Sequence, residues 1–354
     1  MGLKSELWRN KRVLVTGHTG FKGSWLVFWL RQLGADVIGL SLPAPESKPS
    51  LYIDAKIATL ISREYFLDIR DEVGVRRIIQ ELKPDYVFHL AAQAFVYRAL
   101  MNPNESITTN VVGTSNILLA SLSLDSITGI TIATTDKVYQ NIGNHKPFRE
   151  TDVLGSKDPY SASKAAAELV IISLSSTCNP RQIPVTTVRA GNVIGGGDWG
   201  ENRLIPDLVN AISARKTLLI RNPNATRPFQ HILDCLRGYL LIAQSHLEQK
   251  VNTPNSINFG PNNSLSVKQV ISIFESAFGK KLTYKVLQSN FNEANQLELD
   301  SELAFRYLGW QPYISPEKTI SQTALWYLDF IRGNDASDLM LNELSKYKSE
   351  EATQ

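Results

Sequence analysis

A tyrosine and a lysine four positions apart form the reactive pair from which the sequence is best approached. Tyr160 and Lys164 lie in the segment YSASK, and this spacing places both side chains on one face of a helix. An ammonium beside a phenol favours the phenolate, so we expect Lys164 to lower the pKa of Tyr160 and to let it remove a hydroxyl proton near neutral pH. Such pairs also occur by chance on surface helices, so the interpretation depends on what else the chain carries.

A second polar group follows the apolar segment Ile130–Thr134, which is typical of a buried strand. Thr135, Asp136 and Lys137 come directly after it. Residues at the carboxyl ends of parallel strands line the ligand crevice of such sheets. We therefore expect Thr135 to hydrogen-bond a sugar hydroxyl, with the two charged residues beside it. Taken alone, Asp136 and Lys137 are also typical of an ordinary polar loop.

Glycines recur every three residues in GHTGFKG, between the apolar strand Arg12–Thr16 and a helical pattern over Ser24–Leu33. A pyrophosphate needs backbone N–H donors, a positive helix end and no side chain in its approach, and this turn offers all three. The predicted dinucleotide turn consists of Gly17, His18, Thr19, Gly20, Phe21, Lys22 and Gly23. We interpret His18 and Lys22 either as phosphate or ribose contacts or as solvated loop residues.

The identity of the dinucleotide is left open by the residues themselves. An acidic residue is expected after the second strand to bind the ribose, but the strand Asp36–Ser41 ends without one and the next acid is Glu46. NAD and NADP are therefore not distinguished. Asp68, at the end of a third strand Glu64–Asp68, is placed either for the adenine amino group or for capping the next helix.

The elements that must position these groups alternate between strand and helix, which predicts a doubly wound, parallel Rossmann-type α/β sheet. Further expected elements are the helices Asp71–Leu82, Pro103–Leu124 and Tyr160–Thr177 and the strands Asp85–Leu90 and Val185–Arg189. We expect a cofactor-binding domain at 1–190, with a return strand near 256–260, and a smaller, discontinuous, mixed α/β substrate domain at 191–354. The polar tail after Gly333 is expected to be mobile.

Composition narrows the class of protein. The formal charge of the 354 residues is only +3 and is spread along the chain, which gives no reason to expect nucleic-acid binding. No apolar stretch is long enough to cross a membrane. The two cysteines, Cys178 and Cys235, are far apart, which fits unpaired thiols in a reducing compartment. We expect a cytoplasmic protein with no metal site and no membrane or nucleic-acid partner.

Several longer segments together carry a family resemblance. They are GHTGFKGSWL (17–26), HLAAQ (89–93), TTDKVY (134–139), YSASK (160–164), RAGNVIGGGDW (189–199) and RPFQH (227–231). On these segments the chain resembles the CDP-glucose 4,6-dehydratases, a family of the extended short-chain dehydrogenases/reductases, from about Trp8 to Trp326. The glycine turn and YSASK are common to that whole superfamily. The specific features are GHTGFKG, GGGDW, RPFQH, and TDK where related dTDP-glucose dehydratases have TDE.

The resemblance implies a lyase that converts CDP-glucose to CDP-4-dehydro-6-deoxyglucose for deoxysugar and O-antigen synthesis. It implies a bound NAD that takes a hydride from C-4 and returns it to C-6 after water is lost across C-5 and C-6. Tyr160 would take the proton of the 4-hydroxyl, and Asp136 would protonate the departing 6-hydroxyl. Lys137 would be the base at C-5, with Lys164 and the nicotinamide cation favouring its neutral form.

Binding residues are carried over in the same way. Besides the glycine turn, NAD would contact Ser41, Asp68, Ile69, Leu90, Ala91, Ala92, Gln93, Asn110, Tyr160 and Lys164. The sugar and diphosphate would contact Gln93, Asn192, Arg203 and Arg227, because the arginine fork suits phosphate oxygens. The resemblance also implies a homodimer through the helices Pro103–Leu124 and Tyr160–Thr177, or a homotetramer.

Three other functions share parts of this pattern. A nucleotide-sugar 4-epimerase would share Tyr160, Lys164 and the glycine turn, but it needs no acid and base after Thr135. A UDP-N-acetylhexosamine 4,6-dehydratase would also carry a lysine beside the aspartate. A non-catalytic dinucleotide-sensing protein would have no reason to keep both Tyr160 and Lys164. The pair Asp136 and Lys137 therefore favours a dehydratase.

Overall fold

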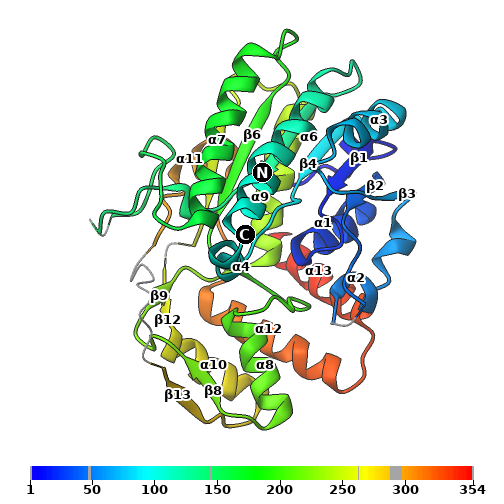
Figure 1. The fold of residues 1–354 in the computed structure, drawn as a ribbon. Helices are drawn as coiled ribbons and strands as arrows, with labels where there is room; N and C mark the ends of the chain where they lie inside the picture. Colours follow the sequence, from blue (N-terminus) through cyan, green and yellow to red (C-terminus); the bar gives the residue numbers. More distant parts are fainter. Residues whose placement is uncertain (1, 47–48, 144–145, 262, 288–296, 353–354) are drawn as a thin grey trace.

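The computed structural model describes residues 2–46, 49–143, 146–261, 263–287 and 297–352, and is built around a parallel seven-stranded sheet (Figure 1). The strand order is β11-β6-β5-β4-β1-β2-β3. The strands are β1 (Arg12–Thr16), β2 (Asp36–Ser41), β3 (Arg63–Phe66), β4 (Tyr86–His89), β5 (Gly129–Ala133), β6 (Val185–Ala190) and β11 (Ser256–Phe259). The strand order reverses between β1 and β4, so a ligand crevice is expected at their carboxyl ends.

The strands are apolar on both faces because helices cover both. In β1, Val13 and Val15 belong to one hydrophobic core together with Trp25, whereas Leu14 belongs to a second core with Ile38. Successive side chains of a strand point to opposite faces, so a strand buried on both sides is a continuous apolar run. This is why RVLVT and DVIGLS form neighbouring interior strands.

Two groups of helices make these two layers. The first core contains residues of α1 (Phe21–Gln32) and α9 (Ile232–Leu247), and the second contains residues of α3 (Glu72–Leu82), α6 (Thr114–Leu122) and α7 (Pro159–Thr177). Shorter helices α2 (Leu51–Asp54), α4 (Val96–Met101) and α5 (Pro103–Ile107) lie in the connections. The single helix expected over Pro103–Leu124 is interrupted by a π-helical turn, Thr108–Gly113, between α5 and α6.

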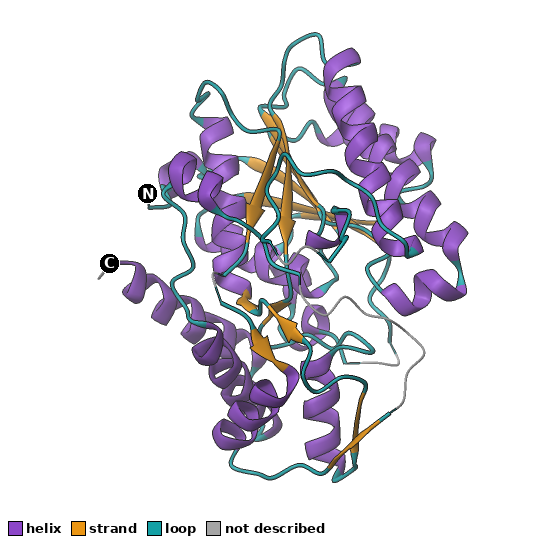
Figure 2. Ribbon diagram, turned by 90° about the vertical axis from the view of Figure 1, so that its left-hand side faces the viewer, coloured by secondary structure: helices purple, strands orange, loops and turns teal. Residues whose placement is uncertain are grey.

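Apart from α9, β11 and the C-terminal helix, the elements that follow β6 form a separate group below the sheet, which we call the second layer (Figure 2). Its helices are α8 (Leu204–Ala214), α10 (Val267–Phe278), α11 (Glu302–Leu308) and α12 (Pro316–Ile331). Its short strands pair as β7 (Val193–Ile194) with β10 (Gln230–His231), β9 (Thr226–Arg227) with β12 (Leu265–Ser266), and β8 (Leu218–Ile220) with β13 (Tyr284–Val286). Between them the chain returns to the main sheet, because β11 pairs with β6.

The polar tail after Gly333 is helical rather than mobile. Helix α13 (Ala336–Ala352) buries Met340, Leu344 and Tyr347. These residues are spaced by four and three positions, so they form one apolar stripe that the many charged neighbours conceal. The Tyr347 hydroxyl also donates a hydrogen bond to Asp234 of α9 at 2.7 Å. No helix of the described part is long and apolar enough to cross a membrane.

Candidate active site

The glycine turn follows β1 at the switch point of the sheet. Gly17 has a φ of +73°, and a Cβ there would lie 2.7 Å from the Ala91 nitrogen. A Cβ on Gly23 would lie only 2.1 Å from the Gly17 carbonyl oxygen. Helix α1 begins at Phe21, three residues before the predicted start, so its free N–H groups open directly onto the turn. This side-chain-free cradle at a helix N-terminus fits a dinucleotide pyrophosphate.

His18 and Lys22 both differ from solvated loop residues. The His18 side chain is fully buried against Gly39, and its Nε2 lies 2.7 Å from Oε1 of Glu64. Burial lowers the pKa of His18, although Glu64 opposes this. The Lys22 ammonium lies 5.9 Å from the ring centroid of buried Tyr239. His18 therefore shapes the turn from behind.

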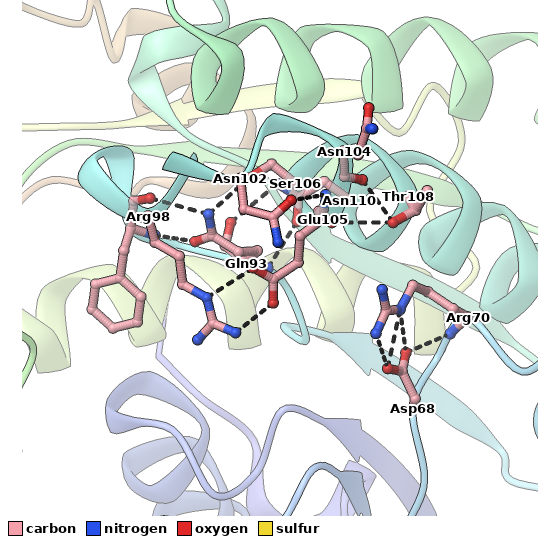
Figure 3. A network of polar contacts seen from close by, with 11 residues as sticks. Asp68, Arg70, Gln93, Arg98, Asn102, Asn104, Glu105, Ser106, Thr108 and Asn110 are labelled. Atoms are coloured by element: carbon pink, nitrogen blue, oxygen red, sulfur yellow. Dashed lines mark hydrogen bonds and ion pairs between the residues drawn. The ribbon is translucent and has the colours of Figure 1, made fainter. Parts of the chain in front are cut away.

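Hydroxyl groups stand where an acidic ribose ligand was expected. Thr19 Oγ1 and Ser41 Oγ, at the end of β2, lie 2.6 Å apart. Beyond β3, Asp68 accepts a hydrogen bond from Nε of Arg70 at 3.0 Å, and this bond lowers the Asp68 pKa (Figure 3). Asp68 is thus held as a carboxylate at this end of the crevice, while the neighbouring Ile69 is buried in the core.

The loop after β4 is held by a network of polar contacts (Figure 3). The Asn110 amide donates to the Gln93 carbonyl at 3.1 Å and to Ser163 Oγ at 2.9 Å, and its Oδ1 accepts from the Gln93 nitrogen at 2.9 Å. The Gln93 side chain donates to Ser106 and accepts from the Phe95 nitrogen. The polar atoms of Gln93 and Asn110 are therefore engaged within the protein, where they fix this loop against α7.

The first residues of the same loop are positioned by β1. Thr16 Oγ1 accepts hydrogen bonds from the backbone nitrogens of Leu90 and Ala91, both at 3.1 Å. Ala91 is the residue that lies against Gly17. The predicted contacts Leu90 and Ala91 thus border the glycine turn through their backbone, which needs no particular side chain, and Ala92 follows them in the chain.

Helix α7 supplies the tyrosine and the lysine. Asp158 caps its N-terminus by accepting a hydrogen bond from the Ser161 nitrogen at 2.9 Å. Tyr160 and Lys164 are both buried, and Lys164 Nζ donates to the Ala133 carbonyl at the end of β5 at 2.8 Å. Burial lowers the pKa of Lys164 to about 8. The helix thereby presents its reactive face to the carboxyl end of β5.

Thr135, Asp136 and Lys137 lie beside this face. Thr135 Oγ1 donates to Asp136 Oδ1 at 2.9 Å, and Lys137 Nζ donates to the same oxygen at 3.0 Å. The other oxygen, Oδ2, is buried and has no hydrogen-bond partner in the described part of the chain. A Cβ on Gly191 would lie 3.4 Å from it, so a glycine keeps room on that side. A buried carboxylate oxygen without a partner among the residues described is a candidate hydrogen-bonding group for a bound molecule.

The electrostatics of Tyr160 differ from the expectation. Its pKa is raised, because burial outweighs the lowering by the Lys137 charge and by a hydrogen bond from Thr135. The expected lowering by Lys164 is not found, since the neighbouring ammonium that favours the phenolate is that of Lys137. Burial also lowers the pKa of Lys137, but the charges of Asp136 and Tyr160 outweigh it and the net pKa is raised. The expectation that Lys164 favours neutral Lys137 is therefore not met.

Two arginines approach the same residues from the second layer. Arg203, at the start of α8, pairs with Asp198 at 2.9 Å, and its guanidinium lies 5.4 Å from the ring centroid of Phe95. Asp198 raises the pKa of Arg203, and the charge of Tyr160 adds to this. Arg227, in β9, is close enough to Lys137 to lower its pKa. The structure thus gathers both arginines around the reactive groups.

Asn192 and two further groups complete the surroundings. Asn192 follows β6, and its carbonyl accepts a hydrogen bond from the Gln230 nitrogen at 3.0 Å, which links it to the RPFQH segment. The sequence interpretation missed Phe95 and the buried pair of Glu168 with Arg189. Glu168 could have been found from its position four residues after Lys164. Phe95 carries no signal, because it meets Arg203 only through the tertiary fold.

A Rossmann-type sheet, a glycine turn after β1 and a Tyr-x-x-x-Lys helix beside a Thr-Asp-Lys segment define an extended short-chain dehydrogenase/reductase. Comparison with known proteins narrows this class. Residues 14–323 match the family model described as GDP-mannose 4,6 dehydratase. The chain is 37% identical to CDP-glucose 4,6-dehydratase of Salmonella typhimurium, over 98% of this chain and 99% of that one. The chain therefore belongs to the nucleotide-sugar 4,6-dehydratase family.

Other relatives are more distant. A UDP-glucose 4-epimerase of Neisseria meningitidis is 26% identical over 92% of this chain and 99% of its own. The structure of DesIV, a dTDP-glucose 4,6-dehydratase from Streptomyces venezuelae with NAD and TYD bound, superposes with a TM-score of 0.77 and 25% identity. That match covers 90% of this chain and 97% of DesIV.

Proposed function

We propose that this enzyme dehydrates CDP-glucose to CDP-4-dehydro-6-deoxyglucose with NAD as its resident cofactor. The observation that carries the proposal is the contact of Lys137 with Asp136, 3.0 Å apart beside buried Tyr160. Elimination of water needs a base that removes the C-5 proton and an acid that protonates the 6-hydroxyl. Oxidation at C-4 alone needs neither of these two groups. The relationship to CDP-glucose 4,6-dehydratase supports the cytidine nucleotide.

The cofactor site is built from groups that fit NAD. The glycine cradle and the α1 N-terminus would hold the pyrophosphate. Thr19 and Ser41 would face one ribose, and Lys164 would lie on the nicotinamide side with Tyr160. When bound, NAD supplies a hydride acceptor for C-4 and a hydride donor for C-6. The presence of NAD in the related DesIV structure supports this choice over NADP.

Tyr160 opens the reaction by taking the proton of the 4-hydroxyl. Burial raises the Tyr160 pKa, so this step requires the phenolate to form when cofactor and sugar are bound, and the Lys137 charge and the hydrogen bond from Thr135 both favour it. Thr135 is also placed to orient the 4-hydroxyl. Once Tyr160 has become a neutral phenol, it no longer contributes to the raised pKa of Lys137. Lys137 is then better able to pass its own proton to Asp136, whose Oδ1 lies 3.0 Å away, and to act as the base at C-5. Proton uptake at the first residue thereby prepares the second.

Asp136 would complete the elimination by protonating the departing 6-hydroxyl through its open oxygen, Oδ2. Arg203 and Arg227 would bind the diphosphate and orient the sugar, with Asn192 at the link between them. The pairing of Arg203 with Asp198 at 2.9 Å holds the guanidinium in place. The interactions of Arg203 with Tyr160 and of Arg227 with Lys137 support the two arginine assignments.

We also propose that the enzyme is a homodimer, or a homotetramer built from such dimers. The outer surfaces of the adjoining helices α5–α6 and α7 expose Ile107, Val112, Leu169 and Ile172, which are 46–59% exposed. Several exposed apolar side chains on two adjacent helices fit a second copy of the same surface. The two cysteines are free thiols, which fits the cytoplasm as the compartment.

The decisive experiment follows one hydrogen atom. CDP-glucose deuterated at C-4 should give a product that has lost one molecule of water and carries deuterium at C-6. An epimerase would leave the label at C-4, and a simple dehydrogenase would release it in the reduced cofactor. Parallel incubations with UDP-, GDP- and dTDP-glucose should show much slower conversion. If one of these nucleotide sugars is converted faster than CDP-glucose, the assignment of cytosine as the nucleobase is refuted.

A further inference from the structure

Three consecutive turns of α7 face the end of β5. Tyr160, Lys164 and Glu168 recur every four residues and therefore share one helix face. Lys164 donates to the Ala133 carbonyl at 2.8 Å, and Thr134 Oγ1 donates to Glu168 Oε1 at 2.6 Å. Glu168 thus grips the residue that directly precedes the Thr-Asp-Lys segment.

The carboxylate of Glu168 is buried and fully engaged. Arg189 Nε lies 2.8 Å from Oε1 and 3.1 Å from Oε2, and Thr187 donates to Oε2 at 3.2 Å. The two side chains of the ion pair are only 1% and 3% exposed. Arg189 also donates to the Tyr139 hydroxyl at 2.7 Å. A buried carboxylate bound from β6 and from the residue after β5 keeps a fixed position, since each lost contact would leave a polar group unpaired.

The charge of Glu168 acts on Lys164. Burial lowers the pKa of Lys164 to about 8, Glu168 opposes this, and Lys22 of α1 adds to it. His89 of β4 also faces Lys164, but burial lowers its pKa to about 3 and it is neutral at working pH. Tyr160 lies one turn earlier on the same helix. Glu168 is thus the acidic neighbour that keeps the lysine charged against burial and a second ammonium.

We propose that Glu168 is a positioning residue of the reaction centre, which anchors α7 to the end of β5 and holds Lys164 as an ammonium beside Tyr160. This inference rests on the proposed function. Arg189 has a different part in it: it neutralises Glu168 and fixes its orientation, but it supplies no charge that favours the ammonium. The two members of one ion pair should therefore affect the reaction in different ways.

The pH dependence of turnover separates them. In Glu168→Gln the alkaline limb of kcat should move to lower pH by about one unit or more, because Lys164 loses its stabilising charge. In Arg189→Gln the limb should stay or move to higher pH, because Glu168 remains. A purely structural pair would lower kcat in both variants and leave both limbs in place, and this result would overturn the proposal.

Removing one member of a buried pair leaves an unpaired charge, so folding needs its own safeguard. The double variant Glu168→Gln/Arg189→Gln carries neither charge, and its alkaline limb should move in the same direction as that of Glu168→Gln. Circular dichroism and the melting temperature establish that each variant is folded. If Glu168→Gln does not fold, the double variant decides the matter, and an unshifted limb there would overturn the proposal.

A second measurement is independent of turnover. The rate of acetylation of Lys164 by acetic anhydride, followed by mass spectrometry across pH, reports the fraction of free amine. Its midpoint should fall in Glu168→Gln and in the double variant but not in Arg189→Gln. If the wild-type enzyme does not convert CDP-glucose, the proposed function fails while this midpoint still tests Glu168. An equal midpoint in wild type and double variant would contradict the inference.

Discussion

The ammonium of Lys137 lies 3.0 Å from Oδ1 of Asp136, and the second oxygen of that carboxylate has no hydrogen-bond partner in the described part of the chain. Lys137 is thereby held beside a carboxylate whose second oxygen is buried and not engaged by the described residues. This contact distinguishes a site that can eliminate water from one that only oxidises and reduces. The proposed reaction has a first stage, oxidation at C-4, and a second stage, elimination of water across C-5 and C-6.

Replacing the tyrosine should stop the first stage. Tyr160→Phe should reduce kcat about a hundredfold or more, because no group of similar reach remains to take the hydroxyl proton. NAD affinity, measured by fluorescence titration, should be nearly unchanged. Tyr97→Phe removes an exposed hydroxyl and should keep full activity as a control. Near-normal turnover in Tyr160→Phe would remove this residue from the mechanism.

Replacing the lysine should stop elimination of water, and it should slow but not abolish oxidation at C-4, because the Lys137 charge also favours the Tyr160 phenolate. In Lys137→Ala, absorbance of the reduced cofactor should appear on mixing with CDP-glucose and then persist, since C-5 lacks a base. The sugar recovered after quenching should be a 4-keto hexose that keeps its 6-hydroxyl. Asp136→Asn should stall at the same stage, because no acid is then present to protonate the 6-hydroxyl and let it leave as water. Turnover of Lys137→Ala at the wild-type rate would place the base elsewhere.

Phosphate recognition should show in the Michaelis constant. Arg227→Ala should raise the KM for CDP-glucose about tenfold to a hundredfold, as expected for loss of hydrogen bonds to a charged group. The dissociation constant of NAD should change little. Arg306→Ala, at an arginine that is 69% exposed and pairs with Glu302 one turn earlier, provides the matched control. An unchanged KM in Arg227→Ala would assign the RPFQH segment to packing alone.

Two buried histidines should make the fold sensitive to acid. Burial lowers the pKa of His89 and of His246 to about 3, below the ordinary value of 6.5. Between these values the unfolded chain binds more protons than the folded one, so stability is full above pH 6.5 and falls as the pH decreases toward 3. Each histidine should cost about 1.4 kcal/mol for every pH unit in that window.

The melting temperature measured from pH 7 to pH 5 checks this slope. His89→Gln retains a side chain that can hydrogen-bond Thr16 or Thr114, the present partners of His89, and should give a shallower dependence. A slope as steep as that of the wild type would show that His89 contributes nothing to it.

Assembly should depend on the outer surface of α7. Leu169→Glu or Ile172→Glu should lower the molar mass measured by light scattering from that of an oligomer to that of a monomer, because a carboxylate cannot be buried unpaired in an apolar interface. Val251→Glu changes a side chain that is 81% exposed elsewhere and should leave the mass unaltered. A wild-type protein that is monomeric at all concentrations would exclude the proposed dimer.

Local patterns were sufficient for the sheet. The strand expected at Arg12–Thr16 and that expected at Asp36–Ser41 have the bounds found in the structure, because apolar runs between turn signals define buried parallel strands. Helix α1 starts earlier than expected because Lys22 and Gly23 interrupt the apolar pattern without interrupting the helix. Helix α13 was missed because charged residues outnumber its apolar stripe.

The site was predictable only where spacing along one element determines the contact. Tyr160 with Lys164 and the three residues after β5 are of this kind. The contacts of Arg203 with Phe95 and of Lys137 with Tyr160 join separate elements, so no local pattern contains them. The sign of the Tyr160 pKa shift also depends on burial, which emerges only when the second layer covers the crevice.

The docking of α13 on α9 has a consequence for how the enzyme is made. His231, at the end of β10, contacts Glu343, and Arg237 of α9 contacts Glu351, with the His231 and Arg237 side chains fully buried in the finished fold. A ribosome delivers His231 and Arg237 before α13. These two side chains therefore lack their contacts with Glu343 and Glu351 until α13 emerges. The sheet can assemble early. The second layer, which contains Arg227 and adjoins the start of α9, is completed later. Completion of this region thus waits for a helix that is synthesised after α9.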